Sequence, residues 1–384
     1  MPSIPSRSAL ATLLAASAAL FHLLRRLRSH AAPSRFRLIP PAQERVIILG
    51  ASSGTGAALA REYARRGCGT LVLVARRTAE LDALREECLA LAATAETASN
   101  SKGKSGSKAA APTILCARAN CTKEEDVAAL RDLVRGSDAL RGGLDTVHIT
   151  LGVSALLPLF GIAGIDPVRP SASVVKGAEG AHASAEALSS TSGAVARAFT
   201  ANVTSTALIL TALTPVLQLT SRAPAIHLLS SLAALFPAPT RALYGATKAA
   251  QLVLAQGFEL ETETQAAQSQ LGRPQLEGDD ARQRPGRRAK ITFVYLCPGT
   301  ILSDFRRSAV DLPSTEDEGA LARAGVFDST WNTSNGQGGK AKKSDGLTPE
   351  GVARRAIRLV DAQRGGVHTM KLFEFFGRLA LVLA

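Results

Sequence analysis

Short apolar runs alternate with longer amphipathic stretches along most of the chain after Pro40 and Pro41. The runs are four to seven residues long and rich in β-branched residues, as buried strands are, and the stretches between them are rich in Ala, Leu, Glu and Arg, as helices are. We place strands at 45–49, 70–75, 113–117, 146–151, 225–229, 290–296 and 367–370. Helices are predicted at 55–66, 78–92, 123–135, 194–219, 241–264 and 349–362. This alternation predicts an α/β fold with a doubly wound parallel sheet.

Polar and small residues interrupt the alternation in several places. The tracts 93–112, 266–289 and 311–346 are rich in Gly, Ser, Gln or charged residues and are predicted to be flexible loops of one catalytic-size domain, 44–370. The Ala/Ser/Gly-rich connection 158–192 is interpreted either as a substrate-side lobe or as a surface insertion. The final segment, 371–384, is apolar but too short to span a bilayer, so it would cap a pocket, enter the bilayer or pair subunits.

The N-terminus contains an uncharged apolar stretch, 8–24, of seventeen residues. As a helix it would be about 25 Å long, slightly shorter than a bilayer core. Five arginines follow it: Arg25, Arg26, Arg28, Arg35 and Arg37. We therefore predict that 1–43 is a membrane anchor with a basic juxtamembrane segment, which would hold the domain in the cytosol, at the endoplasmic reticulum. The alternative is a mitochondrial presequence, because no acidic residue occurs before Glu44.

Composition narrows the function classes. The chain has 45 Lys and Arg against 32 Asp and Glu, a formal net charge of +13, but the excess lies in four stretches, 25–37, 102–108, 273–290 and 340–345. These stretches lack the interleaved aromatic residues of nucleic-acid sites, so no nucleic-acid partner is predicted. The five cysteines form no CxxC pair and the six histidines have no metal-ligand spacing, so we predict neither a disulfide framework nor a metal site.

A glycine-rich turn follows the first predicted strand. Gly50, Gly54 and Gly56 lie between that strand and an Ala-rich helix, where glycine allows a tight turn and a close approach of the backbone to a pyrophosphate. The second predicted strand ends in Arg76 and Arg77 rather than in the acid that holds the ribose of NAD. Because guanidinium groups can hold a 2′-phosphate, the pattern favours NADP(H).

A second group of polar residues surrounds the fifth predicted strand. Tyr244 and Lys248 stand at i and i+4 and would share one face of a helix. A nearby ammonium group lowers the pKa of a phenol, which suits Tyr244 to proton exchange. Ser231 follows the strand thirteen residues before Tyr244, where its hydroxyl would hydrogen-bond a substrate oxygen. Ser230 is adjacent, but the spacing to Tyr244 favours Ser231.

Together these motifs resemble those of the short-chain dehydrogenases/reductases, over about residues 44–310. GASSGTG at 50–56 matches the phosphate loop of that family, which adds Ser52, Ser53 and Thr55 to the expected cofactor contacts. Ser231, Tyr244 and Lys248 match its catalytic residues, Asn202 matches the fourth of them, and Pro298 and Gly299 match its Pro-Gly after the sixth strand. The resemblance implies a Rossmann fold and homo-oligomers through the helices 194–219 and 241–264.

The resemblance also implies roles for these residues. Hydride would pass between the nicotinamide and a carbonyl carbon while Tyr244 exchanges the proton with the carbonyl oxygen. Lys248 would depress the pKa of Tyr244 and hold the nicotinamide ribose, Ser231 would orient the carbonyl, and Asn202 would support a water.

Several positions depart from the family pattern. Thr150 and Leu151 replace the usual Asn-Ala before Gly152, so the Asn that braces neighbouring strands is missing. Asn120 replaces the acid expected near the adenine, and Thr55 replaces a common Ile. The hydroxyl expected near the nicotinamide amide is Ser303, with Thr300 as the alternative.

The leading hypothesis is a membrane-associated NADPH-dependent oxidoreductase that reduces the carbonyl, or oxidises the alcohol, of a small hydrophobic substrate of lipid or steroid type. The alternative is a sensor or scaffold that binds NADP(H) without turnover.

Overall fold

The computed structural model describes residues 35–100, 112–165, 183–238, 241–269, 271, 287–311 and 346–370. Within these residues the centre of the molecule is a parallel sheet with the strand order β3-β2-β1-β4-β5-β6-β7. The strands are β1 (Arg45–Leu49), β2 (Thr70–Ala75), β3 (Thr113–Arg118), β4 (Thr146–Ile149), β5 (Ala225–Leu229), β6 (Thr292–Pro298) and β7 (Gly366–Met370). The predicted doubly wound parallel sheet is confirmed.

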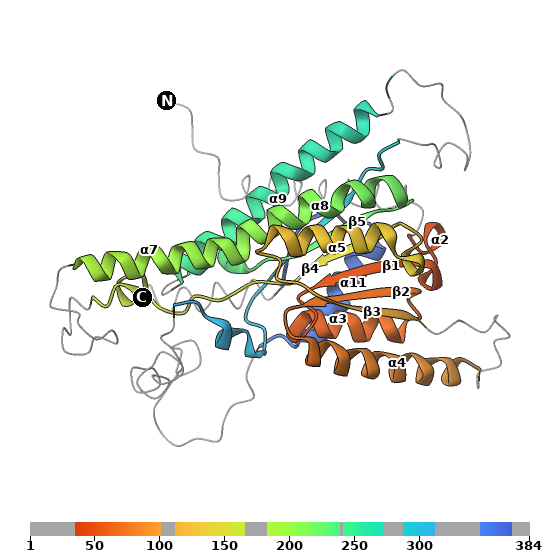
Figure 1. The fold of residues 1–384 in the computed structure, drawn as a ribbon, viewed down its shortest axis with the longest axis horizontal. Coiled ribbons are helices and arrows are strands. Elements are labelled where there is room, and N and C mark those ends of the chain that lie inside the picture. Colours follow the sequence, from red (N-terminus) through yellow and green to blue (C-terminus); the bar gives the residue numbers. More distant parts are fainter. Residues whose placement is uncertain are drawn as a thin grey trace, which may run out of the picture.

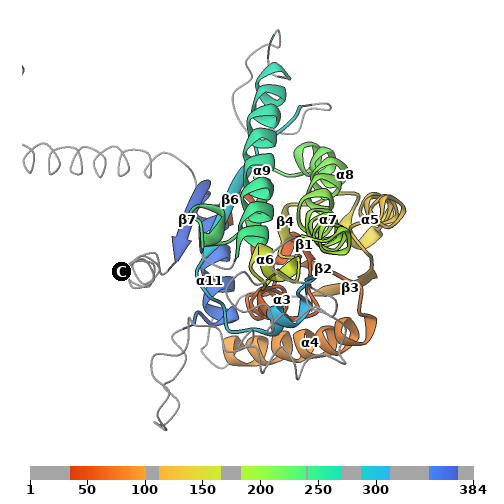
Figure 2. The same ribbon diagram turned by 90° about the vertical axis from the view of Figure 1, so that its left-hand side faces the viewer.

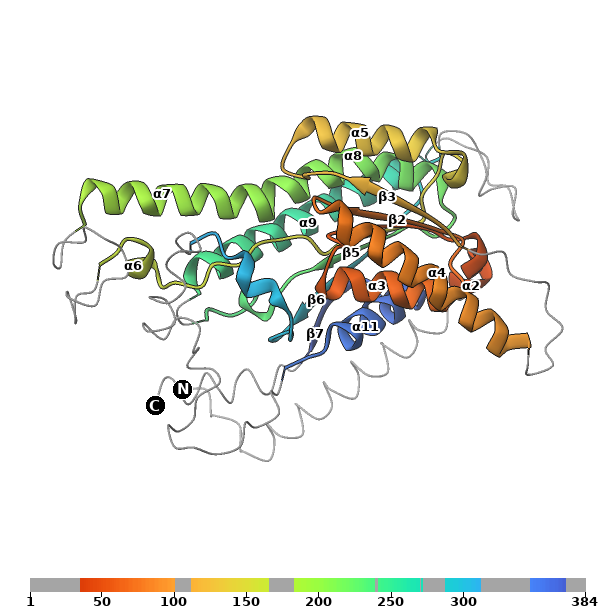
Figure 3. The ribbon, with the colours of Figure 1, turned by 60° about the horizontal axis from the view of Figure 1, so that its bottom comes forward.

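Helices cover both faces of the sheet (Figures 1 and 2). On one face lie α5 (Glu124–Gly136), α8 (Ser205–Thr220) and α9 (Ala242–Gln268), which share an apolar core with alternate residues of the strands. On the other face lie α3 (Gly54–Arg65), α4 (Thr78–Asn100) and α11 (Pro349–Asp361), as Figure 3 shows. Because β1 and β2 are buried on both faces, their sequences consist almost entirely of apolar residues.

The order of the strands reverses beside β1. The chain runs from β1 outward to β2 and β3, and then returns to the other side of β1 to form β4. The connections that leave β1 and β4 therefore diverge to opposite faces of the sheet, which opens a crevice at their carboxyl ends. Most of the residues singled out in the sequence follow the carboxyl end of a strand.

The predicted elements differ from the observed ones mainly at their ends. Helix α4 continues to Asn100 and α9 to Gln268, so the first residues of the predicted loops 93–112 and 266–289 are helical. Both extensions are rich in Ala, Glu, Gln and Thr, and none of these residues breaks a helix as Gly and Pro do. The predicted connection 158–192 contains α6 (Leu159–Ile162) and the start of α7 (Ala185–Phe199).

A single long helical segment joins α7 to α8 through a π-helical turn, Thr200–Thr204. Within the described residues it is the one segment, Ala185–Thr220, that is long and apolar enough to cross a membrane by length and composition, with a mean hydropathy of 1.5. Half of its most apolar window is buried, and α8 packs against α5 and α9 over the sheet. The predicted anchor 8–24 and the C-terminal segment 371–384 lie outside the described residues.

A buried ion network fixes the start of the described chain to the amino ends of the strands. Arg35, in α2 (Arg35–Leu38), donates to Glu44 over 2.5 Å and to the hydroxyl of Thr146 over 2.6 Å. Arg66 pairs with Glu44 and, over 2.9 Å, with Asp361 at the end of α11. Arg35 is only 2% exposed, so this residue of the predicted juxtamembrane segment is part of the buried interior of the domain. Arg35 can be buried because Glu44 pairs with it, since a guanidinium group inside a protein needs charged and hydrogen-bonding partners.

A pair of histidines lies in the core between the sheet and α3. His148 of β4 and His227 of β5 are neighbours in register, with their Nδ1 atoms 3.0 Å apart, and Tyr63 of α3 lies 2.7 Å from Nε2 of His148. Both rings are fully buried. Burial lowers the pKa of His227 to about 3, and burial together with the neighbouring ring lowers the pKa of His148 well below its usual range.

This pair predicts that the domain loses stability in mild acid. The folded chain keeps both rings neutral, whereas the unfolded chain protonates them below about pH 6.5. Unfolding therefore takes up protons between about pH 6 and 4, and each histidine lowers the free energy of unfolding by about 1.4 kcal/mol per pH unit. In urea titrations over this pH range we expect a shallower dependence for His227→Gln, which cannot titrate. Parallel curves for the two proteins would rule out this account.

Candidate active site

A cavity of about 900 Å³ opens at the carboxyl ends of the strands, over the crevice beside β1. Its walls come from the turn after β1, the ends of β2 to β6, and the start of α9. The sequence-predicted residues that line it are Gly50, Ser52, Ser53, Gly54, Thr55, Gly56, Arg76, Arg77, Asn120, Gly152, Ser231, Tyr244, Lys248, Pro298, Gly299 and Ser303. Asn202 is 1% exposed and lies behind the wall beside Gly152.

The turn after β1 is tight, and at two of its glycines a residue with a side chain would be strained or would clash. Gly50 has φ +90°, a left-handed conformation that side chains rarely adopt. A Cβ on Gly56 would lie 2.1 Å from the carbonyl oxygen of Gly50 and 2.8 Å from the hydroxyl of Thr150. Helix α3 begins at Gly54, so its first backbone N–H groups face the cavity from a helix N-terminus, which favours an anion.

Arg77 extends over this turn from the end of β2. Its Nη2 donates to the hydroxyls of Ser52 and Ser53 over 3.0 and 3.2 Å, and its Nη1 pairs with Glu80 over 3.2 Å. Arg76 lines the same part of the cavity, and its charge acts on the thiol of Cys121. Two exposed guanidinium groups therefore flank the glycine-rich turn.

Two departures from the family pattern have structural consequences. The hydroxyl of Thr150 donates to the carbonyl of Leu49 over 2.8 Å, so Thr150 ties the end of β4 to β1 although the usual Asn is absent. The amide oxygen of Asn120 accepts from the backbone and hydroxyl of Thr122, over 3.3 and 2.9 Å. That oxygen already has two donors within its own turn, which leaves the NH₂ group of Asn120 to face a ligand.

Ser230 and Ser231, the two adjacent serines after β5, have different neighbours. Ser231 is half-buried and caps the short helix Leu232–Ala234 by accepting from Ala233 over 3.2 Å. Its hydroxyl lies close enough to the phenol of Tyr244 to lower the pKa of that phenol. Ser230 is buried, and its hydroxyl lies against the thiol of Cys297. The structure therefore brings Ser231, and not Ser230, to Tyr244.

Tyr244 lies one helical turn before Lys248 on α9. Burial raises the pKa of Tyr244, and the hydrogen bond with Ser231 and the charge of Arg241 lower it in part. The expectation that Lys248 depresses this pKa is not met, since the ammonium group is engaged elsewhere: Nζ donates to the carbonyl of Leu229 over 3.2 Å and to Gln251 over 2.9 Å. Burial lowers the pKa of Lys248 to about 8.

Asn202 connects to this group through hydrogen bonds in the core. Its side-chain oxygen accepts from the backbone of Val153 over 2.8 Å, and its NH₂ group donates to Thr247 over 2.9 Å. Gln251 donates to the hydroxyl of Thr206, which donates in turn to the carbonyl oxygen of Asn202 over 2.8 Å. The π-helical turn places that carbonyl beside the site, so Asn202 braces the ends of β4 and α9.

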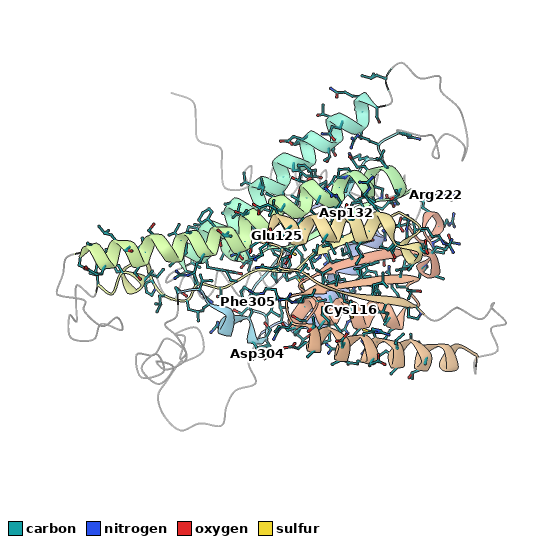
Figure 4. The ribbon with its side chains drawn as sticks, in the orientation of Figure 1. Cys116, Glu125, Asp132, Arg222, Asp304 and Phe305 are labelled. Atoms are coloured by element: carbon teal, nitrogen blue, oxygen red, sulfur yellow. The ribbon has the colours of Figure 1, made fainter. Side chains whose placement is uncertain are left out.

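The segment after β6 closes the other side of the cavity, where Figure 4 labels Asp304 and Phe305. Ser303 lies next to the glycine-rich turn: a Cβ atom added to Gly54 would be 3.7 Å from the Cβ atom of Ser303. The ring of Phe305 meets that of Tyr244 edge to face, with centroids 6.1 Å apart. Asp311 fixes the segment by accepting from the backbone N–H groups of Leu156 and Leu157 over 2.7 Å.

Two arginines beside Tyr244 were missed in the sequence. The guanidinium of Arg241 lies 5.6 Å from the centroid of the Tyr244 ring, and its Nη1 donates to Ser154 and to the carbonyl of Ala155. Arg306 lines the same cavity, and burial lowers its pKa. Neither residue belongs to a motif, and only the folded segment after β6 brings Arg306 to Arg241.

Comparisons with known proteins bear on the fold. No protein-family model matches the chain, and no curated protein sequence matches it. Among solved structures it is similar to an alcohol dehydrogenase from the archaeon Thermococcus sibiricus complexed with 5-hydroxy-NADP, with 17% identity, a TM-score of 0.53, and coverage of 85% of this chain and 95% of that one. It is also similar to a short-chain dehydrogenase from Sphingobium yanoikuyae in complex with NADPH (20% identity, TM-score 0.50, 88% and 94% covered).

A third similar structure is levodione reductase, with 15% identity, a TM-score of 0.52, and coverage of 85% and 95%. These identities are low, so the likeness concerns the arrangement of the elements. That arrangement, with the glycine-rich turn, Ser231, Tyr244 and Lys248 around one cavity, gives this chain the fold of the short-chain dehydrogenases/reductases.

Proposed function

We propose that this chain is an NADP(H)-dependent oxidoreductase that reduces the carbonyl group of a small hydrophobic substrate, or oxidises the corresponding alcohol. The observation that carries the proposal is the convergence of Ser231, Tyr244 and Lys248 with the glycine-rich turn on one cavity. The NADP-type ligands named for two of the similar structures support the choice of cofactor.

The residues present fit a dinucleotide. A Cβ on Gly56 would clash with the carbonyl of Gly50, so this glycine keeps the turn tight, and the start of α3 lines the cavity where a pyrophosphate would bind. Arg76 and Arg77 would hold the 2′-phosphate, Ser303 and the Pro298-Gly299 turn would contact the nicotinamide end, and Lys248 would hold the ribose. The bound cofactor would supply or accept the hydride.

The protein's own contribution is proton transfer and orientation. The hydroxyl of Ser231 lies close enough to the phenol of Tyr244 to lower its pKa, so a carbonyl oxygen between the two hydroxyls would accept from both. Tyr244 would then give its proton to the oxygen as hydride reaches the carbon. The hydrogen-bonded chain from Lys248 through Gln251 and Thr206 holds the ammonium in place in the wall of the cavity.

The surroundings of Tyr244 support a hydrophobic substrate. Tyr244 packs against a small apolar core that includes Ala155, Leu157 and Leu243, and Val310 packs on the same core. Phe305 and Leu302 add apolar surface at the mouth, where each is more than a third exposed. Apolar side chains beside the reacting groups are typical of sites for small hydrophobic ligands.

The first test is of the catalytic residues. In an NADPH-oxidation assay against a panel of lipid ketones, steroids and quinones, Tyr244→Phe is expected to lose about 10²- to 10⁴-fold in kcat, because the proton donor is removed. Ser231→Ala is expected to lose activity in the same assay. Ser230→Ala, one residue away, is the matched control and is expected to stay within about threefold of the native chain, since its hydroxyl lies against the thiol of Cys297 and does not act on Tyr244. Binding of NADPH without any turnover would support the sensor or scaffold instead.

The second test is of the cofactor preference. Replacing Arg77 by Gln, and Arg76 by Gln separately, is expected to weaken NADPH binding about 10- to 100-fold, because charge-assisted hydrogen bonds to the phosphate are lost. NADH, which lacks the 2′-phosphate, should bind almost unchanged. Fluorescence titration of both nucleotides measures this, with Arg85→Gln on the outside of α4 as the control. Equal losses for NADPH and NADH would argue against the assigned 2′-phosphate site.

Attachment to a membrane through 8–24 is a further part of the proposal, with the domain in the cytosol at the endoplasmic reticulum. We expect the full chain to resist alkaline carbonate extraction and a chain that lacks residues 1–24 to be released, with its fold intact because Arg35 remains. A chain shortened in mitochondria would favour the presequence, and an uncut chain that carbonate releases would exclude the anchor.

A further inference from the structure

We propose that Gln251 is a positioning residue of this active site: its amide oxygen keeps the side chain of Lys248 in the charged, ammonium form in the wall of the cavity, where the cofactor ribose would bind. The inference rests on the proposed function, in which Lys248 holds the nicotinamide ribose. It deepens that function, because it assigns to a residue outside the catalytic motif the range of pH in which the site binds its cofactor.

Gln251 places a polar amide in the apolar core beside the active site. It follows Lys248 by three residues on α9, it is fully buried, and its neighbour Leu252 belongs to the core that α9 shares with the sheet. A buried amide costs free energy unless its polar groups are bonded. Both groups are bonded here: Oε1 accepts from Nζ of Lys248 over 2.9 Å, and Nε2 donates to the hydroxyl of Thr206 over 2.7 Å. The oxygen of the amide is thus given to the ammonium group.

Thr206 fixes which end of the amide faces Lys248. The hydroxyl of Thr206 donates to the carbonyl oxygen of Asn202 over 2.8 Å, so its proton is used and its oxygen is left to accept. The group that meets this oxygen must then be the NH₂ group of Gln251, which turns the amide oxygen toward the ammonium group. Thr206 and Asn202 are both buried, so solvent does not compete for these bonds. The hydrogen-bonded chain therefore has one direction, and it ends on Lys248 with an acceptor.

The ammonium group depends on its acceptors because it is buried. Lys248 is 3% exposed, and burial lowers its pKa to about 8. Two neutral oxygens accept from Nζ: Oε1 of Gln251 and, over 3.2 Å, the carbonyl oxygen of Leu229. A hydrogen bond to the charged form of a group favours that form. Loss of the amide oxygen of Gln251 would therefore lower the pKa of Lys248 further, toward neutral pH.

The titratable groups around Lys248 do not replace this acceptor. Among the described residues, Cys297 on β6 is the group whose charge acts on Lys248, but burial raises the pKa of its thiol to about 11. Tyr244, one turn earlier on α9, is also neutral at pH 8, because burial raises the pKa of its phenol. Neither group supplies a negative charge near pH 8. In this range the charge of Lys248 is left to its hydrogen bonds.

The test measures the affinity of the full chain for NADPH against pH, by fluorescence titration between about pH 6 and 9.5. Because the charged ammonium group donates to the ribose, the affinity of the native chain should fall above about pH 8, as Lys248 loses its proton. Gln251→Met, which nearly keeps the volume, should move this fall about one to two pH units lower, since a hydrogen bond to a charged group is lost. Gln251→Glu should move it to higher pH, because a carboxylate favours the ammonium form.

Two further variants separate positioning from packing. Thr206→Val keeps the shape of the side chain but removes the hydroxyl that orients the amide, so it should shift the fall in the same direction as Gln251→Met. It also decides the question if Gln251→Met does not fold. Gln218→Met removes another buried amide, on α8 outside the cavity, whose oxygen accepts from Arg288 over 3.0 Å, and should leave the fall at about pH 8. A merely structural role for Gln251 would lower the melting temperature without moving the pH dependence.

The outcomes are distinct from those of the proposed function. Absence of turnover with NADPH still bound rejects the oxidoreductase and leaves the binding profiles to decide the role of Gln251. If the chain does reduce a substrate, the alkaline limb of kcat/KM should shift together with that of binding. Equal pH dependence in the native chain and in Gln251→Met and Gln251→Glu overturns the inference, as does a native affinity that does not fall above pH 8. Absence of any NADPH binding rejects both proposals.

Discussion

The reversal of strand order beside β1 is the constraint on which the rest of the structure depends. The chain builds β2 and β3 on one side of β1 and then returns to the other side of β1 to form β4. The connections after β1 and β4 then leave the sheet toward opposite faces, and the crevice between them cannot be filled by either. The cavity exists because of this topology, and the residues that line it are those that follow strand ends.

The close packing at that crevice explains its unusual residues. Gly56 lies directly against the carbonyl of Gly50, and the hydroxyl of Thr150 ties β4 to β1 at the same point. Asn202 then connects the end of β4 to α9 through its amide, and the π-helical turn that holds it interrupts a long apolar helix. A polar residue in such a helix is costly unless its groups are bonded, and here both ends of the amide are.

Positively charged side chains lie in three separate parts of the cavity. Arg76 and Arg77 lie at the outer end, beside the helix N-terminus that follows the glycine-rich turn. Lys248 lies at the centre, where burial lowers its pKa to about 8. Arg241 and Arg306 lie on the far side, against the phenol of Tyr244 and the apolar walls.

The sequence by itself determined the fold class, the strands and the residues that follow them, because strand and helix periodicities are local properties of the chain. It also identified the glycine-rich turn and the Tyr-Lys helix face, since each is a short pattern with a fixed spacing. Only the tertiary structure decided which of Ser230 and Ser231 faces Tyr244, that Arg35 is buried with Glu44, and that Arg241 and Arg306 share a wall with the phenol. These facts depend on contacts between segments far apart in the chain, and no local pattern records the burial or the charge that such contacts create.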